Sequence, residues 1–298
     1  MDILKINTCP LCGGQQLEHA LTCTDHYASG EQFEVIRCTH CGFLMTQGAP
    51  VEAEIGRYYE TPDYISHSDT QQGLMNRVYH WVRQYMLSRK VALVERVSGL
   101  SEGHLLDYGT GTGYFANAMV CRGWKVKAIE KSPQARTFAQ NHFGLDVETE
   151  HALKDYSPAS LDVVTLWHVM EHLEYLNEMW ETLHLILKEK GVLIVAVPNP
   201  ESYDARKYKE WWAAYDVPRH LWHFSPSTMK RLGEKHGFVC VKEYPMPFDA
   251  FYVSMLTEKY KGNKLSFVKG LWTGMLAWVS SWSKKEYSSS LIYVFRKK

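Results

Sequence analysis

Two cysteine pairs near the N-terminus have the spacing of a metal site. Each pair is followed by glycine, and the two motifs read Cys9-Pro-Leu-Cys12-Gly and Cys38-Thr-His-Cys41-Gly. Four thiolates in tetrahedral geometry favour zinc and leave no open position for water, so the predicted site is structural. Cys23 and His26 offer alternative ligands to the second pair, but the repeated motif favours the four cysteines.

A glycine-rich stretch between two acidic residues predicts a nucleotide site. Asp107 ends a short apolar run, and the residues after it alternate with glycine, in the order Gly109, Thr110, Gly111, Thr112 and Gly113. Glycines let a ligand approach the backbone, and amides at a helix start favour an anionic group. Glu130 follows the next predicted strand, where a carboxylate can accept hydrogen bonds from both hydroxyls of a ribose.

Two cofactors fit this pattern. Gly111-x-Gly113-x-x-Ala116, with Glu130 19 residues after Gly111, fits the fingerprint of a nicotinamide cofactor. S-adenosylmethionine needs the same ribose carboxylate and has no pyrophosphate. Asp107 would then face the methionine ammonium, directly or through water.

A third group of reactive side chains lies in the segment 215–226, which reads Tyr-Asp-Val-Pro-Arg-His-Leu-Trp-His-Phe-Ser-Pro. His220 and His223 are candidates for a base that removes a proton from an acceptor, or for substrate contacts. The alternative is a purely structural role for this loop, in which the imidazoles bind backbone carbonyls and Phe224 packs into the core. We call this the latch interpretation. A metal site here is disfavoured because the two histidines have no evident third ligand.

Strands and helices alternate in an order that would bring these groups to one edge of a sheet. A helix is expected over 74–97, and further helices are expected to begin at Ser132-Pro133, at His168 and at Ser225-Pro226. The predicted strands precede the glycine turn and cover 125–129, 161–167, 192–197, 238–243 and 291–295. We expect three regions: a module at 1–60, a linker and helix at 61–99, and a large domain at 100–298 with an insertion at about 245–289. Tyr58, Tyr59 and Tyr64 would either pack the linker on the large domain or form a lid.

The chain resembles the class I S-adenosylmethionine-dependent methyltransferases. The residues that carry this resemblance are the series Asp107-x-Gly109-x-Gly111-x-Gly113, Glu130 and the buried strand 161–167. The resemblance covers about residues 100–245 and is to the branch of the ubiquinone-biosynthesis O-methyltransferases, while the module at 1–60 resembles a zinc ribbon. It implies an α/β fold with a Rossmann-like, seven-stranded, mostly parallel sheet preceded by the ribbon. It also implies S-adenosyl-L-methionine as the cofactor, with contacts from Asp107, Gly109, Thr110, Gly111, Gly113, Glu130 and His168.

The resemblance implies methyl transfer to a small-molecule, saccharide or lipid-precursor acceptor, at oxygen or alternatively at carbon. A zinc-ribbon-guided RNA methyltransferase is a second interpretation. Basic and acidic residues balance at 33 each, and residues 1–60 hold few lysines and arginines, which disfavours nucleic acid as a partner. A non-catalytic protein that binds the cofactor or a partner is the third interpretation.

The insertion at 245–289 contains an apolar stripe at helical spacing, formed by Val268, Trp272, Met275, Val279 and Trp282. One interpretation is a helix that faces the core or a second subunit of a homodimer. The other is an interfacial helix on anionic lipid, a peripheral membrane contact through 265–285, because tryptophan and lysine are typical of such helices.

Composition indicates a globular protein of a reducing compartment. The 298 residues are 45% hydrophobic and 22% charged, which excludes a wholly disordered or coiled-coil chain. The first ten residues have neither a basic leader nor an apolar core, and no uncharged apolar run reaches the roughly 18 residues of a membrane span. We therefore expect a cytoplasmic location, with the inner membrane surface as the site of any peripheral contact.

Overall fold

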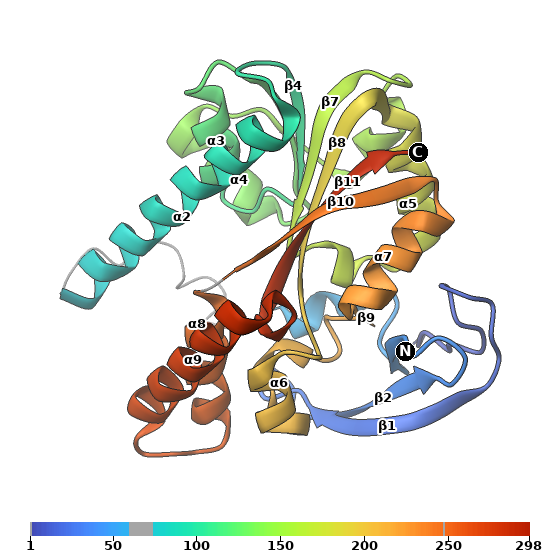
Figure 1. The fold of residues 1–298 in the computed structure, drawn as a ribbon, viewed down its shortest axis with the longest axis vertical. Helices are drawn as coiled ribbons and strands as arrows, with labels where there is room; N and C mark the ends of the chain where they lie inside the picture. Colours follow the sequence, from blue (N-terminus) through green and yellow to red (C-terminus); the bar gives the residue numbers. More distant parts are fainter. Residues whose placement is uncertain (1, 60–73, 247) are drawn as a thin grey trace.

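The structure is a computed structural model that describes residues 2–59, 74–246 and 248–298. Two sheets organise these residues, a large central sheet and a smaller one built mainly from the N-terminal segment (Figure 1). Most of the predicted linker, including Tyr64, lies outside the described residues, and α2 (Leu74–Ser98) is described by its backbone alone up to residue 81.

The large sheet has seven strands in the order β10-β11-β8-β7-β4-β5-β6. Strands β8, β7, β4, β5 and β6 are parallel to one another, while β11 and β10 are antiparallel additions at one edge. This confirms the predicted Rossmann-like, mostly parallel sheet. The strands are His104–Tyr108 (β4), Lys125–Ile129 (β5), Val147–Glu148 (β6), Leu161–Trp167 (β7), Leu187–Pro198 (β8), Phe238–Pro245 (β10) and Ser290–Lys297 (β11).

Helices cover both faces of this sheet. Successive side chains of a strand point to opposite sides, and here both sides carry buried apolar residues. Leu105 belongs to the core under α2 and α3, whereas Leu106 belongs to the core that contains residues of α5 and α7. The same alternation occurs at Val294 and Phe295 in β11. Figure 1 shows α2, α3 and α4 on one side and α5 and α7 on the other. These helices are Tyr114–Val120 (α3), Pro133–Phe143 (α4), Leu176–Ile186 (α5) and Pro226–Lys235 (α7).

Two of the predicted helix starts are confirmed. Ser132 Oγ accepts a hydrogen bond from the Ala135 amide at 3.3 Å and caps α4, and Ser225 Oγ accepts from the Thr228 amide at 3.3 Å and caps α7. A proline follows each cap, where its missing N–H costs nothing.

The predicted helix start at His168 is wrong. His168 has a φ of 58°, which no α-helix continues, and the next residues form only a short 3-10 turn, η3 (Met170–His172). Helix α5 begins at Leu176 and ends at Ile186, because Leu187 already pairs with Leu161 of the sheet.

The smaller sheet joins the predicted module to the segment that carries the candidate base. Its strands are β1 (Leu17–Thr24), β2 (Gln32–Cys38), β3 (Leu44–Gln47) and β9 (Trp222–His223). In β9, His223 pairs with Leu44 and Trp222 pairs with Met45, so a strand from far along the chain completes the N-terminal sheet. The module is therefore built onto the large domain.

The insertion forms an antiparallel helical pair, α8 (Asp249–Tyr260) and α9 (Ser266–Ser283), between β10 and β11. The interpretation that its apolar stripe faces the core is wrong, since Val268, Trp272, Met275, Val279 and Trp282 are all exposed. Small residues on the opposite side of α9, such as Gly270 and Gly274, pack against α8 instead.

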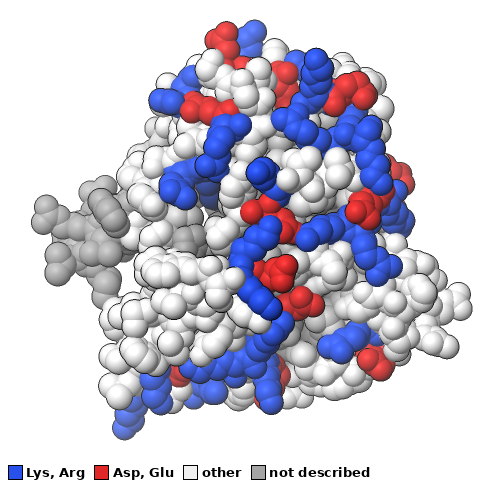
Figure 2. Space-filling model, viewed as in Figure 1, with Lys and Arg blue, Asp and Glu red and all other residues white. Residues whose placement is uncertain are grey.

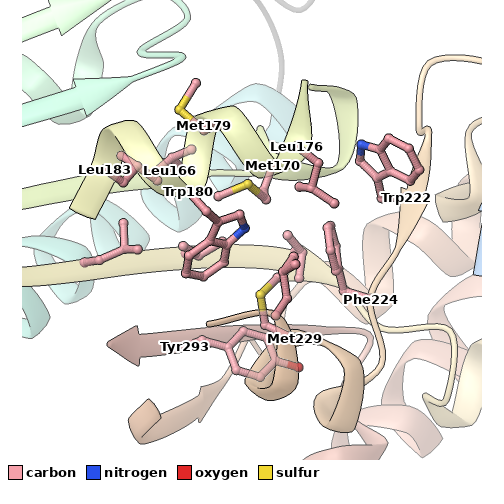
Figure 3. Close-up of a cluster of buried hydrophobic side chains, with 14 of the residues drawn as sticks. Leu166, Met170, Leu176, Met179, Trp180, Leu183, Trp222, Phe224, Met229 and Tyr293 are labelled. Carbon is pink, nitrogen blue, oxygen red and sulfur yellow. The ribbon is translucent and has the colours of Figure 1, made fainter. Parts of the chain in front are cut away.

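A buried cluster fills the space between the sheet, α5 and α7 (Figure 3). It includes Trp180 of α5, Met229 of α7 and Phe224, which is fully buried, as the latch interpretation predicted. No helix in the described ranges is long and apolar enough to cross a bilayer. The remaining short elements are η1 (Ile55–Tyr58), η2 (Glu150–Asp155), α6 (Tyr203–Tyr208), η4 (Lys209–Trp211), η5 (Ala213–Tyr215) and η6 (Lys285–Tyr287).

Candidate functional site

The glycine turn between β4 and α3 lies at the carboxyl edge of the sheet. Gly109, Gly111 and Gly113 all have positive φ values, of 75°, 57° and 80°. A side chain at Gly109 would also place its Cβ 2.4 Å from Val169 Cγ2, whereas the space at Gly111 is open. The Thr110 amide donates to the Ile129 carbonyl at 3.0 Å and holds the turn against the end of β5. Glycine is therefore needed here both for conformation and for close packing.

Glu130 directly follows β5 and faces this turn. Its Oε2 accepts a hydrogen bond from the Gly111 amide at 2.8 Å, and its Oε1 accepts from the Ser132 amide at 2.8 Å. These bonds fix the orientation of the carboxylate. Each oxygen retains a second lone pair, so the group can still accept bonds from the hydroxyls of a ribose.

Asp107 is the buried acid of the site, with only 1% of its surface exposed. Its Oδ1 accepts a hydrogen bond from Thr165 Oγ1 of β7 at 2.7 Å, a partner that the sequence pattern did not indicate. Burial raises the pKa of the Asp107 carboxyl, and this effect outweighs the hydroxyl contacts and the nearby Lys90 ammonium. A cationic ligand group beside Asp107 would stabilise its charged form.

His168 stands between two carboxylates at the end of β7. Its Nε2 lies 3.1 Å from Asp249 Oδ2 at the start of α8, and its Nδ1 lies 3.4 Å from Glu171 Oε1. Burial lowers the pKa of His168, but the two carboxylates outweigh it and raise the pKa to about 9. With this pKa the imidazole is protonated near neutral pH. About one third of the ring is exposed, so the positive charge lies at the surface of the site.

Glu171, His172 and His220 form a second cluster next to this pair. Their ligand-type atoms all lie within 4.8 Å of one another. His220 Nδ1 lies 2.9 Å from the Ala214 carbonyl, and His172 Nδ1 lies 3.0 Å from the Arg219 carbonyl. A carbonyl only accepts, so both Nδ1 atoms carry a proton, and in the neutral form of each ring the lone pair lies on Nε2.

The electrostatics of this cluster lower the pKa values of His172 and Glu171. Burial, with a further contribution from His220, lowers the pKa of His172 to about 4. Burial would raise the pKa of Glu171, but the surrounding imidazoles outweigh it and lower the pKa. The cluster therefore brings together a carboxylate and two imidazoles, groups of the kind that accept a proton or hold a cation. Glu171 and His172 are metal-type groups beside His220 that the sequence pattern did not indicate, and His223 is not part of this group.

His223, the other candidate base, lies apart from this cluster on β9. Its Nε2 is 3.0 Å from Thr46 Oγ1, and the same hydroxyl donates to the His220 carbonyl at 2.6 Å. Because Thr46 has one hydroxyl proton, which goes to the His220 carbonyl, His223 Nε2 must donate to the Thr46 oxygen and cannot itself accept a proton. The partner of His223 is thus a threonine hydroxyl, whereas the backbone carbonyl that the latch interpretation expects is the partner of His220.

The four predicted zinc ligands come together at the turn between β2 and β3. Cys9 Sγ lies 3.5 Å from Cys41 Sγ, and Cys12 Sγ lies 3.6 Å from Cys38 Sγ. A tetrahedral zinc ion with bonds of about 2.3 Å to sulfur separates its ligands by about 3.8 Å, so the thiols fit zinc. All four thiols lie within 4.8 Å of one another, and neither Cys23 nor His26 joins the group.

The two tyrosines of the predicted lid that fall within the described residues have separate roles. Tyr58 is buried and donates a hydrogen bond to Glu31 Oε2 at 2.5 Å, so it packs within the module. Tyr59 reaches the second cluster, where its hydroxyl lies 3.2 Å from His172 Nδ1. The segment after the module therefore borders the candidate site.

Comparison with known proteins gives a family match for this part of the chain. A family model described as a methyltransferase domain matches residues 80–243. The ubiquinone biosynthesis O-methyltransferase of Nitrosomonas europaea is 30% identical over 118 residues, a match that covers 37% of this chain and 50% of that protein. The chain thus spans about half the length of the curated relatives it matches.

Two solved structures share the fold. The 1,6-didemethyltoxoflavin N1-methyltransferase of Burkholderia thailandensis, with bound S-adenosylhomocysteine, is 13% identical with a TM-score of 0.50, covering 86% of this chain and 95% of that one. The geranyl diphosphate C-methyltransferase of Streptomyces coelicolor is 11% identical with a TM-score of 0.50, covering 78% of this chain and 88% of that one. At these identities the likeness concerns the fold alone.

Proposed function

The chain belongs to the methyltransferase domain family and has the class I fold, and we propose that it transfers a methyl group from S-adenosylmethionine to a small-molecule acceptor at oxygen. A saccharide or a lipid precursor is the proposed acceptor class, and carbon is the alternative acceptor atom. The zinc ion proposed for the four thiols is structural in this scheme.

One observation carries the choice of cofactor. Asp107 and Glu130 stand at the ends of the adjacent parallel strands β4 and β5, with the glycine turn between them. In this proposal Glu130 would bind the ribose, and the buried carboxyl of Asp107 would bind a cationic group such as the methionine ammonium. A dinucleotide would need its pyrophosphate at the glycine turn and has no ammonium group to place beside Asp107.

The sheet order also favours this cofactor over a nicotinamide. Nicotinamide-binding sheets of this type are parallel, with six strands in the order 3-2-1-4-5-6. Here the antiparallel β11 lies between β8 and β10, which that order does not contain.

The proposed chemistry needs alignment, exclusion of water and removal of one proton. When bound, the cofactor supplies a methyl group that its sulfonium already activates. His220 Nε2 would take the acceptor hydroxyl proton as the new oxygen–carbon bond forms and the sulfur–carbon bond breaks. Glu171 would stabilise the resulting imidazolium, since its carboxylate is buried beside His220.

Calorimetric titration of the full chain with S-adenosylhomocysteine, and with NADH in parallel, tests the cofactor. We expect binding of the first ligand and not the second. Glu130→Gln should weaken that binding at least about tenfold, because charged acceptors make the stronger hydrogen bonds. Glu148→Gln, on the neighbouring strand β6, is the matched control and should leave it unchanged. Binding of NADH alone would contradict the proposal.

A further inference from the structure

Helix α9 turns a continuous apolar face to solvent. Val268, Trp272 and Trp282 are 60%, 58% and 68% exposed, and Phe267 and Leu271 beside them are 50% and 45% exposed. In Figure 2 the lower left of the molecule, where Figure 1 places α8 and α9, is a broad area without charged side chains. Exposed apolar patches of this kind are characteristic of interaction surfaces.

The packing of α9 on α8 fixes this orientation. A Cβ at Gly270 would lie 2.4 Å from Met255 Cα, and one at Gly274 would lie 2.7 Å from Phe251 Cα. Only glycine allows the two helices to approach this closely, so the small-residue side of α9 must face α8. The tryptophan side therefore stays exposed unless another body covers it.

Lysines predominate beside this face, and Glu286 directly follows the last of them. Residues 261–285 contain no aspartate or glutamate and five lysines, at positions 261, 264, 269, 284 and 285. Lys285 pairs with Glu243 at 2.7 Å. Lys264 and Lys269 lie near the start of α9 and Lys284 directly follows its end, so positive charge flanks the apolar face at both ends. Figure 2 shows lysine and arginine along the lower edge of the uncharged area.

This charge pattern distinguishes a lipid surface from a second copy of the chain. A two-fold antiparallel contact of two α9 helices would set Lys264 and Lys269 of one copy near Lys284 of the other, with no acid between them. An anionic bilayer instead offers phosphates to the lysines and a headgroup boundary to the tryptophans.

We propose that the exposed face of α9 docks on an anionic lipid bilayer. The helix lies in the plane of the interface, with Trp272 and Trp282 inserted at the headgroup level and the flanking lysines beside lipid phosphates. The neighbouring α8 begins at Asp249, whose carboxylate contacts His168, so the docking helices also border the candidate active site. This binding does not depend on the proposed methyl transfer.

Cosedimentation with vesicles tests the inference on the full chain. We expect binding to phosphatidylcholine vesicles that contain about one third phosphatidylglycerol, and weak binding to phosphatidylcholine alone. The double variant Trp272→Ser/Trp282→Ser should lower the partition coefficient at least about tenfold. Lys264→Gln/Lys269→Gln should lower it by about fivefold per lysine, and added salt should reduce binding by the wild type.

A matched control uses exposed apolar residues elsewhere, Tyr175→Ser/Leu185→Ser, at positions that are 63% and 54% exposed. This control should bind vesicles as the wild type does, and thermal unfolding should show that all variants remain folded. Equal vesicle binding by the tryptophan variant and the control would overturn the proposal. So would a dimer in sedimentation velocity that the tryptophan substitutions dissociate while no vesicle binding is seen, since α9 would then bind a second copy.

Discussion

Arg219 donates a hydrogen bond from Nη2 to Asp25 Oδ1 at 2.9 Å and joins the segment that carries His220 to the N-terminal hairpin. Both side chains are buried, with exposures of 4% and 0%. Arg219 also pairs with Asp216 at 2.7 Å and donates to the Tyr58 carbonyl at 2.9 Å. The N-terminal module thus helps to position a candidate catalytic residue, a role separate from metal binding.

Asp25→Asn should weaken this junction. The substitution leaves the buried guanidinium with only one anionic partner, which should lower the free energy of unfolding by about 2–4 kcal/mol. Urea denaturation measures the loss. Lys127→Gln, which breaks the exposed pair with Glu148, is the control and should cost no more than about 1 kcal/mol. Equal effects of the two substitutions would show that the Asp25 contact does not stabilise the junction.

Cys38→Ser should abolish zinc binding. Elemental analysis of the wild-type chain should give about one zinc ion per molecule, and the variant should lose it because three thiolates no longer close the site. Cys23→Ser is the matched control, since this thiol lies outside the group of four, and it should keep the metal. Retention of zinc by Cys38→Ser and its loss from Cys23→Ser would instead assign Cys23 as a ligand.

Local patterns in the sequence were sufficient to predict most strands and helices of the large domain. The strands 125–129 and 161–167 were predicted with the bounds that the structure gives, and Ser132-Pro133 begins a helix as expected. Such features depend on residues within one turn or one strand, and the order of strand, glycine turn, strand and acid then places Asp107 and Glu130 at one edge of the sheet.

Features that depend on distant segments could not be predicted in the same way. Thr46 and His220 are 174 positions apart, and nothing in either local pattern indicates that one binds the other. The helical spacing of the α9 stripe predicted the helix, but a stripe does not say which side a neighbour will cover. Gly270 and Gly274 were the residues that could have indicated which side of α9 packs against another helix. A face of small residues is the one that allows close helix packing.

The stability of the protein should fall in acid partly because of His223. Burial lowers the pKa of this imidazole to about 3, whereas in the unfolded chain the pKa is about 6.5. The unfolded state therefore binds a proton that the folded state does not as pH falls from about 6.5 towards 3, and this difference destabilises the fold. At about pH 5 the contribution should be on the order of 1–2 kcal/mol.

His223→Gln isolates that contribution, because glutamine can still donate to Thr46 and does not titrate. Urea denaturation of both proteins at about pH 7 and about pH 5 should show a smaller loss of stability in the variant. Protonation of the thiols acts on both proteins and cancels in the comparison. Parallel losses in the two proteins would mean that His223 does not contribute to the pH dependence.

His220→Gln should remove the proposed base while it keeps a donor for the Ala214 carbonyl. We expect kcat to fall by about 10²–10⁴-fold, the usual contribution of general base catalysis, with the affinity for S-adenosylhomocysteine unchanged. Transfer of labelled methyl groups into acceptors from a cell extract measures the rate, and calorimetry measures the affinity. His223→Gln is the control, because its Nε2 has no lone pair and its loss should change kcat far less. A purely structural role for His220 would lower the affinity and the free energy of unfolding together with the rate, whereas a base affects the rate alone.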